Sequence, residues 1–172
     1  RTSSDGEILQ PPSDQSLQSL TKRLRKMRPE AIAISLLFSF ANPKNEIAVT
    51  LALEELGLPL SVSHQIFPEF REYERTSTVV VNAYLQPVMQ RYLESVDRRA
   101  EARVFVMQSS GGITALSSAA REPVRTVLSG PAGGVVGAAA MARRSSVERI
   151  ITFDMGGTST DVALVDGEAR AS

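Results

Sequence analysis

The sequence predicts an α/β fold in which a largely parallel sheet is covered by helices, and two observations support this class. Strand-like and helix-like segments alternate along the chain, which is the order that crossovers between parallel strands produce. The run AIAISLLF, residues 31–38, is almost continuously apolar, a pattern typical of a strand covered on both faces. We therefore expect this run to form a buried, central strand.

Two helices in the first part of the chain have clear ends. Ser13 or Asp14 caps the first, leucines at helical spacing follow, and Pro29 ends this surface helix. Asn42 caps the second helix, and Gly57 follows its last turn. The second of these is the best-defined helix that the sequence predicts.

A short strand and a long helix are expected next. Residues 60–67, LSVSHQIF, predict the strand, and the charged segment 68–77 predicts a solvated loop or a subunit contact. Residues 79–99 predict the helix, which Pro87 should kink. We expect its buried face to carry a stripe of large side chains: Val81, Leu85, Val88, Tyr92 and Val96.

The second half of the chain continues the alternation. Residues 102–114 predict a strand that runs into a small-residue turn, and residues 116–123 predict one or two helical turns. Residues 129–145 predict a helix with a glycine-rich entry. Two strands, 149–155 and 160–165, are joined by a turn.

The two chain ends resemble cut points. The chain begins at Arg1 rather than methionine, and Asp166-Gly167 is a tight-turn signal after which Glu168 should start another strand. We therefore expect an internal fragment of a longer protein. A strand edge left open at residues 160–165 would favour a homodimer of the fragment.

Composition excludes several functions. Nineteen basic and nineteen acidic residues leave no net charge, so no overall field attracts nucleic acid or an anionic membrane. The chain has no cysteine and one histidine, which excludes thiolate catalysis and makes a histidine metal cluster implausible. No apolar run approaches the ~20 residues of a membrane span. These features suit a cytoplasmic enzyme.

The turn between the last two strands has the residue types of a phosphate site. Asp154 ends a predicted strand and could hold Mg²⁺, while Gly156 and Gly157 leave backbone N–H groups uncovered for an anion. The hydroxyls of Thr158 and Thr160 would add hydrogen-bond donors. The alternative is a plain hairpin in which the glycines only make the bend.

Other candidates also have two interpretations. Gly111 and Gly112, after Ser109 and Ser110 at a strand end, could contact a ligand or form a simple loop. Gly133 and Gly134, at a helix entry, could bind an anion or permit close packing. His64 is more typical of a satisfied strand-end residue than of a ligand. A serine nucleophile is not supported, because no G-x-S-x-G segment is present.

Several blocks together resemble one known family. FDMGGTSTDVALV, preceded by LSGPAGGVVGA, MQSSGG and FPEFREYERTSTVVVNAYLQP, is similar to the hydantoinase A and 5-oxoprolinase family over residues 30–165. The resemblance implies a ribonuclease-H-like fold of the sugar kinase, Hsp70 and actin type, in which ATP lies between two domains. Each of those domains contributes one phosphate-binding hairpin.

The resemblance also implies a function and a domain boundary. It assigns ATP and Mg²⁺ as cofactors, with Asp154 as the metal ligand, and implies phosphorylation of a cyclic amide at its oxygen before water opens the ring. Residues 1–148 would end the family's N-terminal region, and residues 149–172 would begin the second domain. The family's earlier hairpin motif is absent, so only half of the nucleotide site is expected. A hydantoinase B-type subunit is the implied partner.

Two alternatives to a cyclic-amide hydrolase remain. Some members of the family are subunits of ketone carboxylases, which would also use ATP. A nucleotide-binding module without turnover of its own is the other possibility. The sequence does not distinguish among hydantoin, oxoproline and ketone substrates.

Overall fold

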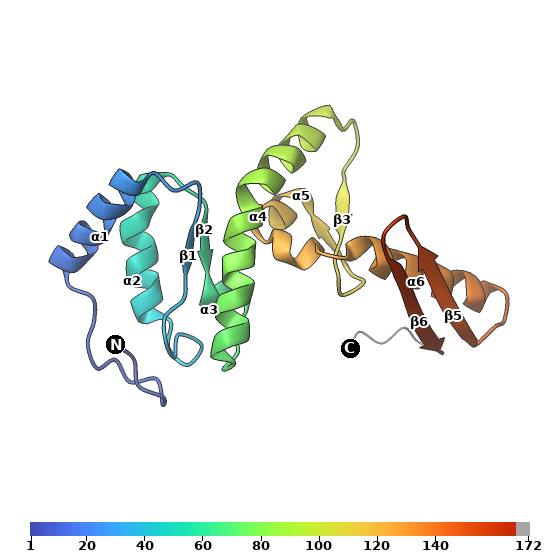
Figure 1. Ribbon diagram of the computed structural model, residues 1–172, viewed down its shortest axis with the longest axis horizontal. Helices are drawn as coiled ribbons and strands as arrows, with labels where there is room; N and C mark the ends of the chain where they lie inside the picture. The colour runs from blue at the N-terminus through green and yellow to red at the C-terminus, as the bar shows by residue number, and fades with distance from the viewer. Residues whose placement is uncertain (168–172) are drawn as a thin grey trace. The chain divides into compact units, whose positions relative to one another are not determined.

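The computed structural model describes residues 1–167 and divides the chain into two compact units (Figure 1). The first unit comprises Arg1–Tyr92 together with Ala120–Val124, and the second comprises Leu93–Ala119 and the chain from Arg125 onward. The strand expected from Glu168 lies outside the described residues. No helix within residues 1–167 combines the length and the apolar character that crossing a membrane requires.

Both predicted helices of the first unit are confirmed. Helix α1 (Asp14–Met27) begins at Ser13, whose Oγ accepts a hydrogen bond from the Ser16 N–H at 3.3 Å. Helix α2 (Lys44–Leu53) is extended by a 3-10 turn, η1 (Glu54–Leu56). The start of α1 is as predicted, whereas the N-cap residue of α2 is Pro43 instead of the expected Asn42, whose Oδ1 accepts from the Lys44 N–H at 3.1 Å.

The strands of the first unit form a single parallel pair. Strand β1 (Ile32–Ile34) pairs in register with β2 (Leu60–Val62), and helix α3 (Ser63–Ile66) follows β2 directly. One face of the pair packs against α1 and α2, and helix α4 (Glu72–Arg99) lies along the other (Figure 1). The hydrophobic core on the first face is built from the buried residues Ile32, Ile34, Leu53 and Val62.

The apolar run at residues 31–38 is not one long strand. Only Ile32–Ile34 is extended, because the chain turns over Leu37–Ala41 and Phe38 adopts a φ of 59°. Ile32 and Ile34 are buried as expected, whereas Ala33 is exposed. The turn places Leu36 beside a buried carboxylate, to which its N–H donates, so polar bonding replaces the predicted strand continuation.

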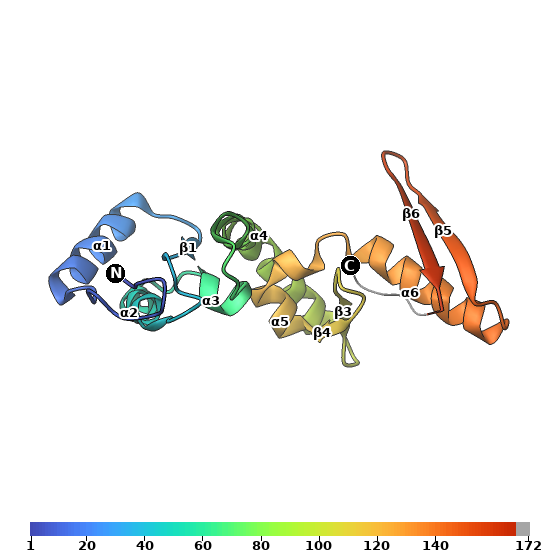
Figure 2. The same cartoon turned by 90° about the horizontal axis from the view of Figure 1, so that it is seen from below.

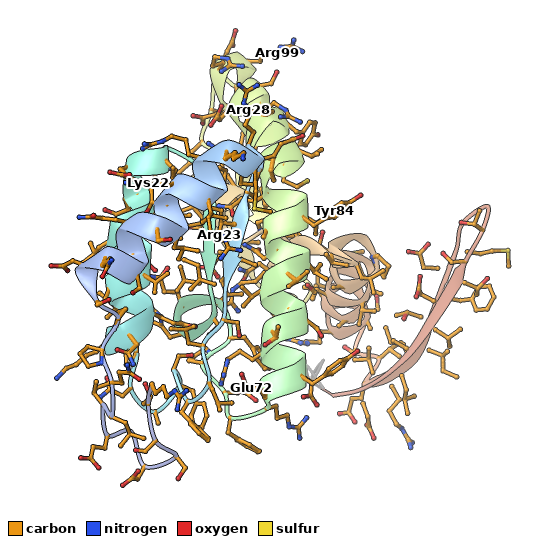
Figure 3. All side chains as sticks on the ribbon, turned by 60° about the vertical axis from the view of Figure 1, so that its left-hand side comes forward. Lys22, Arg23, Arg28, Glu72, Tyr84 and Arg99 are labelled. Atoms are coloured by element: carbon orange, nitrogen blue, oxygen red, sulfur yellow. The ribbon has the colours of Figure 1, made fainter. Side chains whose placement is uncertain are left out.

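The buried face predicted for the long helix was wrong for three of its five residues, whereas Leu85 and Val96 are half-buried. Val81, Val88 and Tyr92 are exposed on α4, and Tyr84 projects away from the strand pair (Figure 3). The side chains buried on this helix include three polar ones, Arg75, Asn82 and Gln86, together with Val79, Ala83 and Leu93. Their polar groups form hydrogen bonds with β2 and with neighbouring segments, and the periodicity of apolar residues does not reveal this stabilisation. The helix runs continuously through Pro87.

The second unit begins with an antiparallel hairpin that the sequence did not predict. Strand β3 (Phe105–Met107) pairs with β4 (Ile113–Ala115) across the small-residue turn. Helix α5 (Leu116–Arg121), the 3-10 turn η2 (Pro123–Thr126) and helix α6 (Ser129–Arg144) follow. The expected helices at 116–123 and 129–145 are therefore present.

The last described elements form a second antiparallel hairpin. Strand β5 (Arg149–Met155) pairs with β6 (Thr160–Asp166), and this hairpin follows the carboxyl-terminal end of α6 in the chain (Figure 2). Within residues 1–167, the fold is thus mixed α/β with three two-stranded sheets, of which only β1–β2 is parallel. The expected largely parallel sheet is absent from this part of the chain, since short turns join β3 to β4 and β5 to β6, and short turns produce antiparallel pairs.

Candidate functional site

The β5–β6 turn has the geometry of a four-residue hairpin loop. Its last strand pair is Met155 with Thr160, and the Gly156 N–H donates to the Ser159 carbonyl at 2.9 Å. The Gly156 N–H therefore closes the turn. The N–H groups of Gly157 and Thr158 have no hydrogen-bond partner within residues 1–167, so they are the ones open to an anion.

Two carboxylates stand opposite each other just before this turn. Asp154 and Asp161 are Cα partners in the hairpin, and both are exposed. They lie on the hairpin face that carries Ile150 and Thr152, because side chains alternate between faces along each strand. The pair places two negative charges next to the uncovered N–H groups of the turn.

A groove lies between this face and helix α6. It encloses about 690 Å³ and is lined by Gly134 and other small residues of α6, and by Asp154, Asp161 and apolar residues of the hairpin. A Cβ added at Gly134 would meet no atom within 4 Å, so this glycine leaves backbone open to the groove. Apolar walls with a few polar groups at one side are typical of small-molecule sites.

The remaining glycine candidates face other parts of the second unit. A Cβ at Gly111, whose φ is 83°, would lie 3.1 Å from Val136 of α6, and one at Gly133 would lie 3.5 Å from Met107 of β3. Gly112 lies in the same β3–β4 turn as Gly111. None of these three glycines lines the groove, so the structure brings only Gly134 together with Asp154.

The groove offers two carboxylates to Mg²⁺ but not a complete set of ligands. Within residues 1–167, no group of three or more His, Asp or Glu side chains is placed to hold a metal ion. Mg²⁺ is usually bound by one or two carboxylates together with water and substrate phosphates. Asp154 and Asp161 supply that number, and the ion's other ligands would have to come from water and nucleotide.

A buried polar cluster occupies the carboxyl ends of β1 and β2 in the first unit. The Glu46 carboxylate of α2 is fully buried, and its Oε1 accepts from the Leu36 N–H and the Ser63 hydroxyl, each at 2.7 Å. Its Oε2 accepts from the His64 N–H at 3.1 Å and is hydrogen-bonded to His64 Nδ1 at 2.7 Å. Ser63 also contacts the Ser39 hydroxyl at 2.9 Å.

Arg75 lies next to this cluster. Its guanidinium donates to the Leu36 carbonyl at 3.1 Å, pairs with Glu72 at 2.5 Å and lies over the Phe40 ring. Leu36 thus connects the two charged side chains, since its N–H bonds to Glu46 and its carbonyl bonds to Arg75. The Arg75 Nε has no partner among the described residues, although the side chain is buried.

Sequence reasoning missed two features of these sites. Asp161 was not among the predicted site residues, but a four-residue turn after Met155 places it opposite Asp154, so the loop length was a usable signal. Glu46 was not singled out, because it lies in an ordinary helical segment. Its contact with His64 spans 18 residues and two elements, and no local pattern predicts it.

The chain belongs to the hydantoinase/oxoprolinase family. Residues 75–172 match the hydantoinase/oxoprolinase domain, and residues 1–57 match the hydantoinase/oxoprolinase N-terminal region. The resemblance noted in the sequence is thereby confirmed. The two matches together account for most of the chain.

Characterised relatives are much longer than this chain. It is 35% identical over 175 residues to the caprolactamase subunit alpha of Pseudomonas jessenii, covering 97% of this chain and 25% of that protein. It is 36% identical over 167 residues to 5-oxoprolinase 1 of Arabidopsis thaliana, covering 93% of this chain and 13% of that protein. The chain therefore spans a quarter or less of these relatives.

Two solved structures share its fold. The crystal structure of ATP-dependent caprolactamase from Pseudomonas jessenii matches with a TM-score of 0.82 and 35% identity, over 95% of this chain and 25% of that one. A nucleotide-free structure of acetone carboxylase, an enzyme of ATP-dependent acetone carboxylation, matches with a TM-score of 0.80 and 31% identity, over 97% and 25%. ATP dependence is thus common to both structural relatives.

Proposed function

We propose that this chain is part of an ATP-dependent enzyme that opens cyclic amides, with the α6 groove as one half of its phosphate site. The observation that carries the proposal is the Asp154–Asp161 pair on the groove wall, next to a turn with uncovered N–H groups. Similarity to ATP-dependent caprolactamase and to 5-oxoprolinase supports the reaction class. The ring that the enzyme opens remains to be identified by a substrate panel.

The proposed role of each residue follows from its position. Asp154 holds Mg²⁺, directly or through water, and Asp161 is the second carboxylate available to the ion. Gly157 and Thr158 bind phosphate oxygens through their N–H groups, and the Thr160 hydroxyl adds a donor. Bound ATP would transfer its γ-phosphoryl group to the amide oxygen and leave as ADP, Mg²⁺ would offset the charge on the phosphates, and the amide carbonyl carbon would become reactive toward water.

The finer architecture is part of the same proposal. The hairpin would open the second domain of a ribonuclease-H-like fold at residue 149, with residues 1–148 ending the region before it. The partner phosphate hairpin and a hydantoinase B-type subunit would lie elsewhere in the assembly. Relatives named as subunits, such as caprolactamase subunit alpha, support a multi-subunit enzyme. A cytoplasmic location suits a chain without cysteine.

A ketone carboxylase subunit is the second candidate function. The match to acetone carboxylase favours it, because that structure is as similar in fold as the caprolactamase. A nucleotide-binding module without turnover is the third. Release of ADP or phosphate by the longer protein, measured separately with cyclic amides and with ketones, separates the three functions.

The phosphate site is tested by Asp154→Ala in the longer protein. Loss of the metal-positioning carboxylate should lower ATP-dependent turnover by orders of magnitude while the fold survives. Asp166→Ala, an exposed aspartate at the other end of the hairpin, is the matched control and should leave turnover unchanged. The 172-residue chain alone should not hydrolyse ATP, because the second half-site is missing. Full activity of Asp154→Ala, or robust turnover by this chain, would refute the assignment.

A further inference from the structure

His64 is held in one orientation by a single carboxylate oxygen. Both its backbone N–H and its ring Nδ1 contact Glu46 Oε2, at 3.1 and 2.7 Å. Two bonds from one residue to one acceptor restrict both the backbone and the ring. Because a carboxylate accepts hydrogen bonds, Nδ1 carries the proton, and the neutral ring has its lone pair on Nε2.

The outer nitrogen of this ring is the reactive group of the cluster. Nε2 has no hydrogen-bond partner within residues 1–167, and the His64 side chain is 15% exposed, whereas that of Glu46 is 0% exposed. Part of the imidazole therefore remains at the surface, whereas the carboxylate is fully enclosed. This is the arrangement in which a buried carboxylate sets the tautomer of a histidine that acts on another molecule.

The position in the fold also suits ligand binding. His64 follows the carboxyl end of β2, beside the segment that follows β1, and these two strands are parallel. Ligands of open parallel sheets bind beyond the carboxyl ends of the strands. The parallel pair belongs to the first unit, and the α6 groove belongs to the second.

A purely structural role does not require the imidazole. Glu46 already receives the N–H groups of Leu36 and His64 and the Ser63 hydroxyl, which together connect the segments after β1 and β2. The additional bond from Nδ1 changes only the ring, by fixing its tautomer and direction. The ring is therefore oriented beyond what joining these segments needs.

We propose that His64 is a ligand-binding residue whose Nε2 accepts a hydrogen bond from the N–H of a cyclic amide. The identity of the ligand rests on the proposed function, whereas the orientation of the ring does not. A cyclic amide has its N–H and carbonyl on the same side of the C–N bond, so an acceptor bound to the N–H lies beside the carbonyl oxygen without bonding to it. Glu46 is the positioning residue that places the proton of the neutral ring on Nδ1, so that Nε2 is the acceptor.

A nuclear magnetic resonance experiment on the chain itself tests the proposal directly. His64 is the only histidine, so a sample labelled with ¹⁵N-histidine gives a single imidazole that needs no assignment. We expect proton-coupled signals of an Nδ1-protonated ring, and a progressive shift of Nε2 as caprolactam is added. N-methylcaprolactam, which lacks the N–H, should leave Nε2 unchanged. An Nε2-protonated ring, no shift with caprolactam, or equal shifts with both compounds would overturn the proposal.

Kinetics of the longer protein supply an independent test. His64→Gln should raise the KM for caprolactam about tenfold, the effect of one hydrogen bond, and leave the KM for ATP unchanged. Gln65→Ala, at an exposed neighbour on α3, should behave like wild type. An unchanged caprolactam KM in a folded His64→Gln variant would overturn the inference but not the ATP-dependent reaction. Absence of lactam-dependent ADP release from wild type would instead refute the proposed function, and the spectra of the chain would still decide the role of His64.

Discussion

Replacing Glu46 with glutamine tests whether the buried cluster stabilises the first unit. The glutamine oxygen can still accept from the Leu36 N–H and the Ser63 hydroxyl, but its NH₂ group then faces the His64 N–H, which donates to Oε2 in the wild type. Two donors would oppose each other. An unsatisfied buried donor costs about 1–3 kcal/mol, and the remaining bonds lose their charge-assisted strength.

The expected loss of stability is about 2–3 kcal/mol. The loss stays below the roughly 3–5 kcal/mol that follows the removal of one partner of a buried ion pair, because the neutral amide also avoids the cost of burying a charge. For a domain of this size, each kcal/mol lowers Tm by about 4–8 °C, so the unfolding midpoint should fall by roughly 10 °C or more. Glu55→Gln is the matched control, because its 3.0 Å pair with Arg25 is exposed and such pairs contribute about 1 kcal/mol or less.

Tyrosine fluorescence is a suitable assay for this prediction. The chain has no tryptophan, and its three tyrosines all lie on α4 within Arg1–Tyr92, so the signal reports on the first unit. Thermal unfolding of Glu46→Gln, Glu55→Gln and wild type should be recorded under identical conditions. A Glu46→Gln midpoint within about 2 °C of wild type would refute the stabilising role of the cluster.

Three further predictions concern packing and association. Leu53→Ala should lower the free energy of unfolding by about 2–5 kcal/mol in the same fluorescence assay, because Leu53 is only 1% exposed. Leu51, on the same helix, is 61% exposed, so Leu51→Ala should lower it by less than about 0.5 kcal/mol. Equal effects of the two substitutions would contradict the assignment of Leu53 to the core. Gly111→Ala should destabilise the second unit by about 1 kcal/mol or more, because Gly111 has a φ of 83° and the new Cβ would lie 3.1 Å from Val136 of α6. Gly112→Ala should destabilise it less. Urea unfolding followed by circular dichroism can rank the two variants. The chain should dimerise, since β6 has only β5 as a partner within the described residues and its outer edge is open; sedimentation that shows only monomer at high concentration would count against this.

Helix ends and the final hairpin could be predicted from short stretches of the chain. Ser13 and Asn42 act through side chains that reach backbone groups two or three residues away, so their effect is encoded locally. The Asp154 to Thr160 segment likewise contains its own turn, and the two strands it joins were correctly placed. The family resemblance also rested on short blocks of sequence, and the matches to the two family regions confirmed it.

The buried face of α4 and the pairing of strands could not be derived in this way. Apolar periodicity favoured Val81, Val88 and Tyr92, but burial followed the polar residues Asn82 and Gln86, whose partners lie on β2 and at the end of α5. Pairing of β3 with β4 depended on a turn that the small residues between them allowed but did not require. In both cases the deciding energy is a contact between separate segments.

Local chemistry in this protein is therefore readable from the chain, whereas the assembly of its polar sites is not. The sequence identified Asp154 and its turn as a candidate phosphate site, because the residues that define the site are neighbours. The Glu46–His64 pair and the groove shared by Gly134 and Asp154 exist only after folding, since each joins residues many positions apart. Caps and turns depend on a few adjacent dihedral angles, but a buried carboxylate becomes a site only when tertiary packing removes water and brings its donors together.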